Sequence, residues 1–166
     1  MSTENLNKEE SWEKLRDLVD DIKIAMMVTG LEKKPINAIP MGTKKVDDNG
    51  NIWFLSMGSS EHNRNLQTNP DVHLLYSDPD DMEFMSLYGR AEITKDRSVL
   101  EDLYNPRTDN WFDGPDDPNL TAIKVTPAEA YYWDTKTNKY VTLLKMGVGA
   151  ITGDNQDIGE KGKLNL

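Results

Sequence analysis

The sequence predicts a mainly-β fold, an antiparallel β-barrel with peripheral helices, and three observations support this prediction. Short stretches with period-2 alternation recur along the chain, and turn-forming residues separate them. The dipeptide Asn49-Gly50 stands between two of these stretches and is typical of a tight hairpin. The short, even spacing favours a barrel over a sheet of βαβ units. The expected strands are 24–29, 36–41, 52–56, 72–77, 83–94 and 120–134.

The N-terminal part is expected to form one helix and then the first two strands. Large apolar residues recur at helical spacing and predict an amphipathic helix over about residues 8–21, namely Trp12, Leu15, Leu18, Val19 and Ile22. Gly30 ends the first strand. The second strand contains Pro40, which cannot donate a ladder hydrogen bond, so we expect this strand at an edge or at a barrel opening.

The C-terminal part is expected to combine a hairpin, a short helix and a long loop. The turn at 78–81 joins the fourth and fifth strands, and Asp96 is expected to cap a short helix. Residues 105–119 hold three prolines and four aspartates and should form a loop. From about Tyr140 we expect another helix, and after about Gly153 a loose polar tail. All 166 residues are expected to form a single domain.

Composition excludes several classes of function. A net charge of −10 argues against nucleic acid or an anionic membrane as partner, since both need a basic surface. No apolar run approaches the roughly 20 residues of a membrane span. The first residues lack the pattern of a secretory signal. With no cysteine the chain has no disulfide, no thiolate metal site and no cysteine nucleophile, which fits a cytoplasmic protein.

The sequence contains no recognisable catalytic or metal-binding cluster. His62 and His73 lack the spacing of metal ligands, and we expect no metal site. Asp78, Asp80 and Asp81 resemble a calcium loop only superficially, since the glycine and glutamate of that motif do not follow in register. These aspartates are better explained as turn formers. The sequence therefore identifies no catalytic residue.

The stretch from Ile52 to Asp78 carries the most informative pattern. An apolar strand is followed at once by Ser56, Ser59 and Ser60, which open a short polar helix that ends at Asn69-Pro70. A strand that delivers hydroxyl groups to a helix N-terminus suits an anion, because free backbone amides and the helix dipole both favour negative charge. The alternative is that these serines only cap the helix. The residues alone leave both interpretations open.

This stretch belongs to a larger set that resembles a known family. Together with Ala38-Ile39-Pro40-Met41, Trp111-Phe112, Asp116-Asp117-Pro118 and Tyr131-Tyr132-Trp133-Asp134, it is similar to the general stress protein branch of the pyridoxamine 5'-phosphate oxidase-like FMN-binding split barrels. The similarity runs from about Trp12 to Asp154 in one order. It implies a six-stranded antiparallel split barrel with Greek-key connections, a homodimer, and FMN bound between the subunits.

The resemblance also implies a cofactor site, carried over residue by residue. The matching positions are Ala38, Ile39, Pro40, Met41, Leu55, Ser56, Ser60, Glu61, His62, Phe84 and Trp133. Ile39 stands where the family usually has an arginine, and His62 where it commonly has a phosphate-binding lysine. Since a hydrogen bond to a charged group contributes about 1.5–3 kcal/mol, these replacements should weaken FMN binding. Lys44, Lys45 and Arg64 are candidates to compensate, or else they are solvated surface residues.

The function implied by the resemblance is that of a flavin-dependent oxidoreductase acting on an unidentified small molecule. The alternatives are a flavin-binding or stress-response module without turnover, and a scaffold that has lost the cofactor. Split barrels also occur with haem or a deazaflavin. Pyridoxamine phosphate oxidation is not expected, because the C-terminal part lacks that branch's basic substrate-binding set. Trp111-Phe112 is either a loop plug or part of the substrate pocket or dimer contact, and Trp133 is either a packing residue or a neighbour of the flavin.

Overall fold

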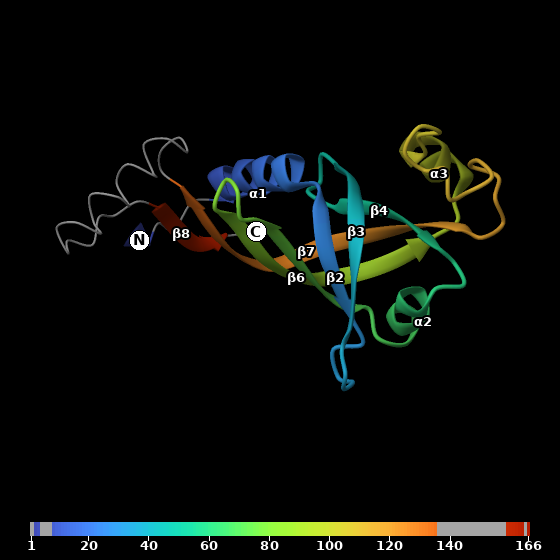
Figure 1. Ribbon diagram of the computed structural model, residues 1–166, viewed down its shortest axis with the longest axis horizontal. Helices are drawn as coiled ribbons and strands as arrows, with labels where there is room; N and C mark the ends of the chain where they lie inside the picture. The colour runs from blue at the N-terminus through green and yellow to red at the C-terminus, as the bar shows by residue number, and fades with distance from the viewer. Residues whose placement is uncertain (1, 4–7, 136–158, 165) are drawn as a thin grey trace.

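The computed structural model describes residues 2–3, 8–135, 159–164 and 166, and it has a mainly-β fold built on a closed barrel (Figure 1). Six antiparallel strands form the barrel in the order β2–β3–β4–β7–β6–β5, and β5 pairs with β2 to close it. The strands are β2 Ile24–Thr29, β3 Asn37–Val46, β4 Ile52–Met57, β5 Asp71–Asp78, β6 Glu83–Thr94 and β7 Leu120–Thr135. The predicted six-stranded barrel is confirmed.

The barrel core follows from the alternation of each strand. Along β4 the side chains of Ile52, Phe54 and Ser56 are buried while the residues between them are half-buried. The inward-facing residues of all six strands form one apolar cluster, which includes Met27, Phe54, Leu74, Leu87 and Ile123. The same alternation directs the other residues of each strand to the outside of the barrel, where a ligand or partner can reach them.

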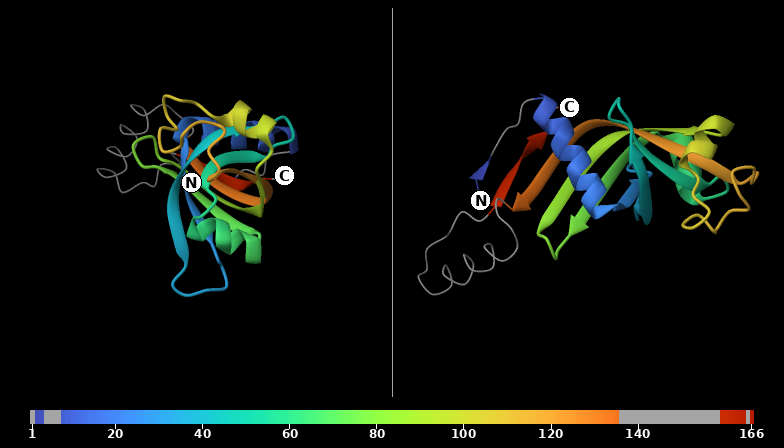
Figure 2. Two further views of the ribbon diagram at one scale, coloured as in Figure 1. Left: turned by 90° about the vertical axis from the view of Figure 1, so that its right-hand side faces the viewer. Right: turned by 90° about the horizontal axis from the view of Figure 1, so that it is seen from above.

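Three helices flank the barrel in the described part of the chain: α1 Lys8–Ile22, α2 Glu61–Thr68 and α3 Arg97–Leu103. Helix α1 lies across the barrel and buries Leu15, Leu18 and Val19 against it (Figure 2). Helix α2 begins after Ser60, whose Oγ accepts a hydrogen bond from the Asn63 amide at 3.3 Å. Asp96 accepts from two amides at the start of α3, as the sequence predicts.

The turn between β3 and β4 ties helix α1 to the barrel. Gly50 has a φ of +80° there, and a Cβ at this position would lie 2.3 Å from the Trp12 ring. The turn therefore needs glycine both for its backbone and for the close approach of the tryptophan. The Asp47 carboxylate accepts from the Asn51 amide at 2.9 Å and from the Trp53 indole at 2.8 Å.

Two strands outside the barrel correct the expected C-terminal tail. Strand β8, Gly159–Leu164, pairs antiparallel with residues 130–135 of β7, and β1, Ser2–Thr3, pairs parallel with β8. The expectation of a loose polar tail was therefore wrong for these residues. In β8 only Leu164 is a large apolar residue, so the alternation is too sparse to read from sequence. The helix expected from Tyr140 lies outside the described residues.

Strand β3 is also longer than predicted, because it continues through Gly42-Thr43-Lys44-Lys45 to Val46 instead of ending at Met41. Polar and charged side chains along this extension conceal the strand in the sequence. Within the described residues no helix has the length and apolar character needed to cross a membrane.

Candidate functional site

A cleft of 570 Å³ opens at the end of the barrel where β3 and β4 meet helix α2 and the loop at 104–119. Its volume lies in the range of small-molecule sites, which is roughly 300–1,000 Å³. The walls combine apolar side chains with a few polar ones. The residues that line it are Pro40, Met41, Gly42, Thr43, Lys44, Leu55, Ser56, Met57, His62, Thr108, Asp109, Trp111 and Phe112.

A β-bulge in β3 places a charged residue on the cleft wall. Thr43 pairs with Phe54 and Lys45 pairs with Trp53, so Lys44 is an extra residue with no partner of its own in the register. A bulge changes the direction of the side chain that it carries, and bulges are common beside binding sites. The Lys44 side chain is 17% exposed and reaches the loop at 104–119. The sequence marks Lys44 as a candidate to bind the phosphate, but it does not predict the bulge.

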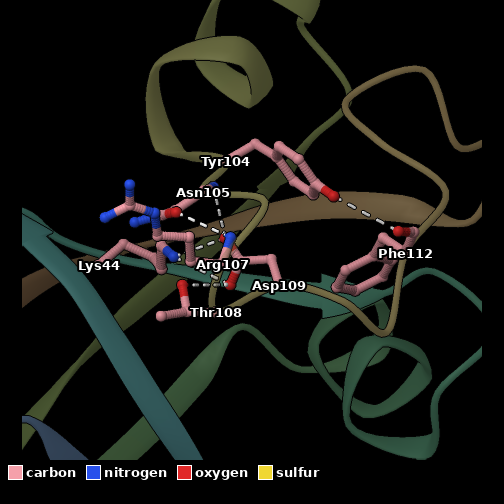
Figure 3. A network of polar contacts seen from close by, with 7 residues as sticks. All are labelled: Lys44, Tyr104, Asn105, Arg107, Thr108, Asp109 and Phe112. Atoms are coloured by element: carbon pink, nitrogen blue, oxygen red, sulfur yellow. Dashed lines mark hydrogen bonds and ion pairs between the residues drawn. The ribbon is translucent and has the colours of Figure 1, made fainter.

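The Lys44 ammonium forms an ion pair with Asp109 at the centre of a polar network (Figure 3). Lys44 Nζ donates to Asp109 Oδ2 at 2.7 Å and to Oδ1 at 3.0 Å. The same carboxylate accepts from the Asn105 amide at 2.7 Å, and the Phe112 amide donates to the Asp109 carbonyl at 3.1 Å. Asp109 thus connects the β3 bulge to both sides of the loop.

Ser56 lines the cleft, but its hydroxyl group is directed into the protein. The residue is 3% exposed, and Oγ donates to Asn63 Oδ1 at 2.9 Å. Thr121 Oγ1 lies 2.7 Å from Ser56 Oγ and itself donates to the Ser56 carbonyl at 3.0 Å. This arrangement joins β4, α2 and β7. The Ser56 side chain therefore holds the fold together at the cleft floor rather than offering a free donor.

His62 follows the start of helix α2 and lines the cleft. Its Nε2 lies 3.0 Å from Ser60 Oγ, so the capping serine also fixes the imidazole. Burial lowers the pKa of His62 below its usual range. The imidazole is therefore neutral at pH 7 and adds no positive charge to the cleft.

The aromatic pair in the loop divides into one packed and one exposed residue. Phe112 packs against a small second core that includes Leu100, Leu103 and Leu120. Trp111 remains 76% exposed at the cleft rim. In this chain Trp111 does not plug the barrel, and a large apolar side chain at a cleft rim is a common feature of ligand and partner contacts.

The structure brings together five of the residues predicted for the site: Pro40, Met41, Leu55, Ser56 and His62 all line the cleft. Ala38 is exposed on β3, Ile39 packs against the barrel core, and Ser60 and Glu61 stand at the start of α2 beside the cleft. Phe84 and Trp133 are register partners on β6 and β7, where β7 also pairs with β8. They do not line the cleft.

Sequence reasoning missed Thr108 and Asp109, together with the neighbouring wall residues Gly42, Thr43 and Met57. Asp109 was one of four aspartates in a proline-containing loop, and nothing in the sequence separates it from the other three. Its burial is the distinguishing feature, since it is 8% exposed and Asp113 and Asp116 are exposed.

An exposed apolar surface borders the cleft on the outside of the barrel. Pro40 on β3, Met26 on β2 and Leu75 on β5 lie side by side in register, and Ile24 continues the surface along β2. Met26 is 40%, Leu75 43% and Ile24 57% exposed. We call these four residues the outer apolar face. Pro40 belongs both to this face and to the cleft.

Comparison with known proteins identifies similar chains. Residues 10–157 match the family model described as "Pyridoxamine 5'-phosphate oxidase like". General stress protein 26 of Bacillus subtilis is 23% identical over 129 residues, which cover 75% of this chain and 89% of that protein. The structure of a putative general stress protein 26 from Jannaschia sp. CCS1 superimposes with a TM-score of 0.78 at 24% identity, over 96% of this chain and 100% of that one.

A third similar protein is the general stress FMN/FAD binding protein from the phytopathogen Xanthomonas citri. Its structure superimposes with a TM-score of 0.66 at 21% identity, and the match covers 80% of this chain and 93% of that chain. At these identities the two solved structures establish the likeness of the fold.

Proposed function

The chain belongs to the pyridoxamine 5'-phosphate oxidase-like family, and on this premise we propose that it binds FMN in the cleft between β3, β4 and α2 and acts as a flavin-dependent oxidoreductase of the general stress protein type. The observation that carries the proposal is the cleft itself, which gathers five of the residues that the resemblance assigns to the cofactor. The FMN/FAD binding protein of Xanthomonas citri, which shares the fold, supports the choice of ligand.

The cleft fits a flavin in size and in the chemistry of its walls. Its 570 Å³ suits a planar aromatic ligand, and Met41, Leu55, Met57 and Trp111 provide apolar contact. The cleft offers little free positive charge to the phosphate. Lys44 is the one permanently charged cation among the residues lining the cleft, and it is already paired with Asp109. We therefore expect FMN to bind with modest affinity.

Five residues of the cleft have a defined role in this proposal. Pro40 and Met41 provide backbone and apolar contacts to the ring, Leu55 packs against it, and Lys44 faces the phosphate. Ser56 holds β4 against α2 and contributes no free hydroxyl. The bound flavin supplies hydride or electron transfer, while the protein binds it, orients it and limits its contact with water.

We further propose that the protein is a homodimer in which the outer apolar face is covered by a second copy. Exposed methionine, isoleucine and leucine side chains on β2 and β5, with Pro40 beside them on β3, are typical of a contact surface. Because Pro40 belongs to this face and to the cleft, a partner seated there would reach the cleft rim. The cofactor site would then be completed between two subunits.

The main alternative is a flavin-binding module without turnover, and one observation favours it. The titratable side chains that line the cleft are Lys44, Asp109 and His62, and the first two neutralise each other. His62 is thus the one titratable side chain of the lining that lies outside an ion pair, and burial favours its neutral form. The cleft offers little acid–base chemistry of its own.

Three measurements test these proposals. The absorption spectrum of freshly purified protein should show flavin bands between about 350 and 500 nm, and titration with FMN should give saturable binding. A colourless protein that does not bind FMN would point to a scaffold without cofactor. Under anaerobic conditions a nicotinamide reductant should bleach an oxidoreductase, whereas a binding module would stay yellow.

The dimer is tested by light scattering on the Met26→Glu variant. A charge at the centre of the outer apolar face should convert a dimer into a monomer of 18.9 kDa. Gln67→Glu, an exposed position on α2, adds the same charge outside the face and should leave the dimer intact. A wild-type monomer at micromolar concentration would refute the proposal.

A further inference from the structure

We propose that Asp109 is an internal competitor for the anionic group of the ligand, so that a phosphate must take Lys44 from Asp109 before it can bind fully. This inference rests on the proposed function, since it concerns the phosphate of the flavin. Among the residues that line the cleft, Lys44 is the single lysine or arginine and Asp109 the single carboxylate. The site therefore contains one positive charge and its own neutralising anion.

The contact between the two residues is well formed. Both carboxylate oxygens of Asp109 accept from the ammonium, at 2.7 and 3.0 Å, and the two side chains are 17% and 12% exposed. Ion pairs shielded from solvent in this way are screened much less by water and salt than surface pairs. A neighbouring pair provides the contrast: Lys45 and Asp102 also form an ion pair, but their side chains are 43% and 61% exposed.

The competition follows from elementary electrostatics. A phosphate near Lys44 would accept from the same ammonium and would repel the Asp109 carboxylate beside it. His62 is neutral and offers no charge to offset that repulsion. The phosphate is then bound only at the expense of the contact between Lys44 and Asp109. A ligand without a phosphate, such as riboflavin, does not disturb that contact.

Displacing Asp109 would also release the loop at 104–119. The carboxylate holds the Asn105 amide at 2.7 Å, and the backbone of Asp109 bonds to Asn105 and to Phe112. Trp111 and Phe112, which line the cleft, lie in the same loop. The charge of the ligand is thereby linked to the position of the aromatic residues that cover it. Asp109 determines whether the cleft prefers phosphorylated or unphosphorylated ligands.

Calorimetric titration of FMN and of riboflavin against four proteins tests the inference: the wild type, Asp109→Asn, Asp102→Asn, and the double variant Lys44→Met with Asp109→Asn. Asp109→Asn should bind FMN about tenfold more tightly than the wild type, the size of one charged hydrogen bond. Its affinity for riboflavin should be unchanged. Asp102→Asn should bind FMN as tightly as the wild type. The double variant should not show the tenfold increase in FMN affinity.

Two outcomes would overturn the inference: an Asp109→Asn variant that binds FMN no better than the wild type, or one that gains equally for riboflavin, which would mean only a wider cleft. If no protein binds either flavin, the proposed function fails, and inorganic phosphate decides the inference separately. Phosphate should raise the melting temperature of Asp109→Asn above that in chloride of equal ionic strength, and only while Lys44 is present. An equal response in both salts would contradict it.

If Asp109→Asn does not fold, Asp109→Ser replaces it, and the wild type provides an independent measurement. Hydrogen exchange of the loop at 104–119 should quicken when FMN binds, because the Asn105 amide loses its carboxylate partner. Riboflavin should leave that exchange unchanged. Identical exchange with the two flavins would show that the phosphate does not displace Asp109.

Discussion

The two ends of the barrel each contain a mostly buried lysine, and their surroundings differ in charge balance. At the cleft end Lys44 faces the single carboxylate of Asp109. At the β8 end Lys14 of helix α1 pairs with Asp134 of β7 and lies 3.3 Å from Glu160 of β8. Among the described residues, Lys44 pairs with one carboxylate and Lys14 with two.

This difference indicates different roles for the two lysines. Burial lowers the pKa of Lys14, but hydrogen bonds and charge from Asp134 and Glu160 outweigh it, and the net pKa is raised. Its ammonium also lies 5.4 Å from the centre of the Tyr132 ring, which suits a cation. Lys14 thus connects α1, β7 and β8 and is a structural residue. Lys44 connects a strand to a loop beside a cleft, where the proposed phosphate would replace its partner.

The largest expected effect comes from comparing Lys14→Met with Lys44→Met. Lys14→Met removes the cation that pairs with Asp134, which is 8% exposed and close to other carboxylates, so it should cost about 3 kcal/mol of unfolding free energy. Lys44→Met should cost about half as much, because Asp109 still accepts from the Asn105 amide and Thr108 hydroxyl. Urea denaturation measures both.

Lys45→Met is the matched control for that comparison, since its ion pair with Asp102 is exposed. It should change the unfolding free energy by less than about 0.5 kcal/mol. Equal costs for the Lys14 and Lys44 variants would remove the distinction between a structural lysine and a ligand-facing one.

The next effect concerns the cleft floor and separates folding from binding. Ser56→Ala removes the donor to Asn63 and a partner of Thr121 in a buried network, so it should cost about 1–2 kcal/mol of stability. Because that hydroxyl is not free, the affinity of the folded variant for FMN should stay within about twofold of the wild type. Denaturation and flavin titration on one preparation measure both. A large loss of FMN affinity in a fully folded variant would instead indicate that Ser56 contacts the phosphate.

At the β8 end the excess of carboxylates should make stability depend on pH. Burial raises the pKa of Glu83 to about 7, with further contributions from Asp134, Asp21 and Asp81 and an opposing one from Lys14. The folded state therefore binds a proton more tightly than the unfolded state, and stability is lost as the pH rises from the unfolded value to the folded one.

Glu83→Gln should remove that loss. With an allowance for solvent screening, the variant should be more stable than the wild type by about 1 kcal/mol at pH 8. At pH 4.5 the difference should fall below about 0.5 kcal/mol, since Glu83 is then protonated when folded and about half protonated when unfolded. Urea denaturation at both pH values measures the difference. A constant difference at both values would mean that the titration of Glu83 does not affect folding.

The smallest expected effect is on the affinity of the cleft for FMN. His62→Lys adds a positive charge to the cleft lining and should strengthen FMN binding by about 1 kcal/mol, roughly fivefold. From the sequence alone, protonation of His62 predicts tighter binding between pH 8 and 6. Burial shifts that gain toward lower pH, so the increase in FMN affinity between pH 8 and pH 7 should be smaller than an exposed histidine would give. Equal affinities of the variant and wild type at pH 7 would place His62 away from the phosphate.

The elements predicted well are those that local rules specify. Strands β2 and β6 have the bounds expected from their alternation, and Ser60 and Asp96 cap the helices that follow them. Helix α1 buries the apolar face that its spacing predicts. These features depend on side-chain periodicity and on hydrogen bonds between near neighbours in sequence, so they can be read without knowing the remainder of the fold.

The cleft and the charges at both ends of the barrel were decided by tertiary structure. The sequence contains Lys44 and Asp109 as two polar residues 65 positions apart, and only the closure of the barrel and the bulge in β3 bring them into contact. The sequence left open whether the Ser56 hydroxyl binds a ligand or only supports the helix start, and in the structure Asn63 and Thr121 take up its hydrogen bonds. Strand β8 forms because β7 offers it an unpaired edge. The direction in which a side chain points, its burial and its bonding partner depend on contacts between residues distant in sequence. The local sequence pattern does not encode them.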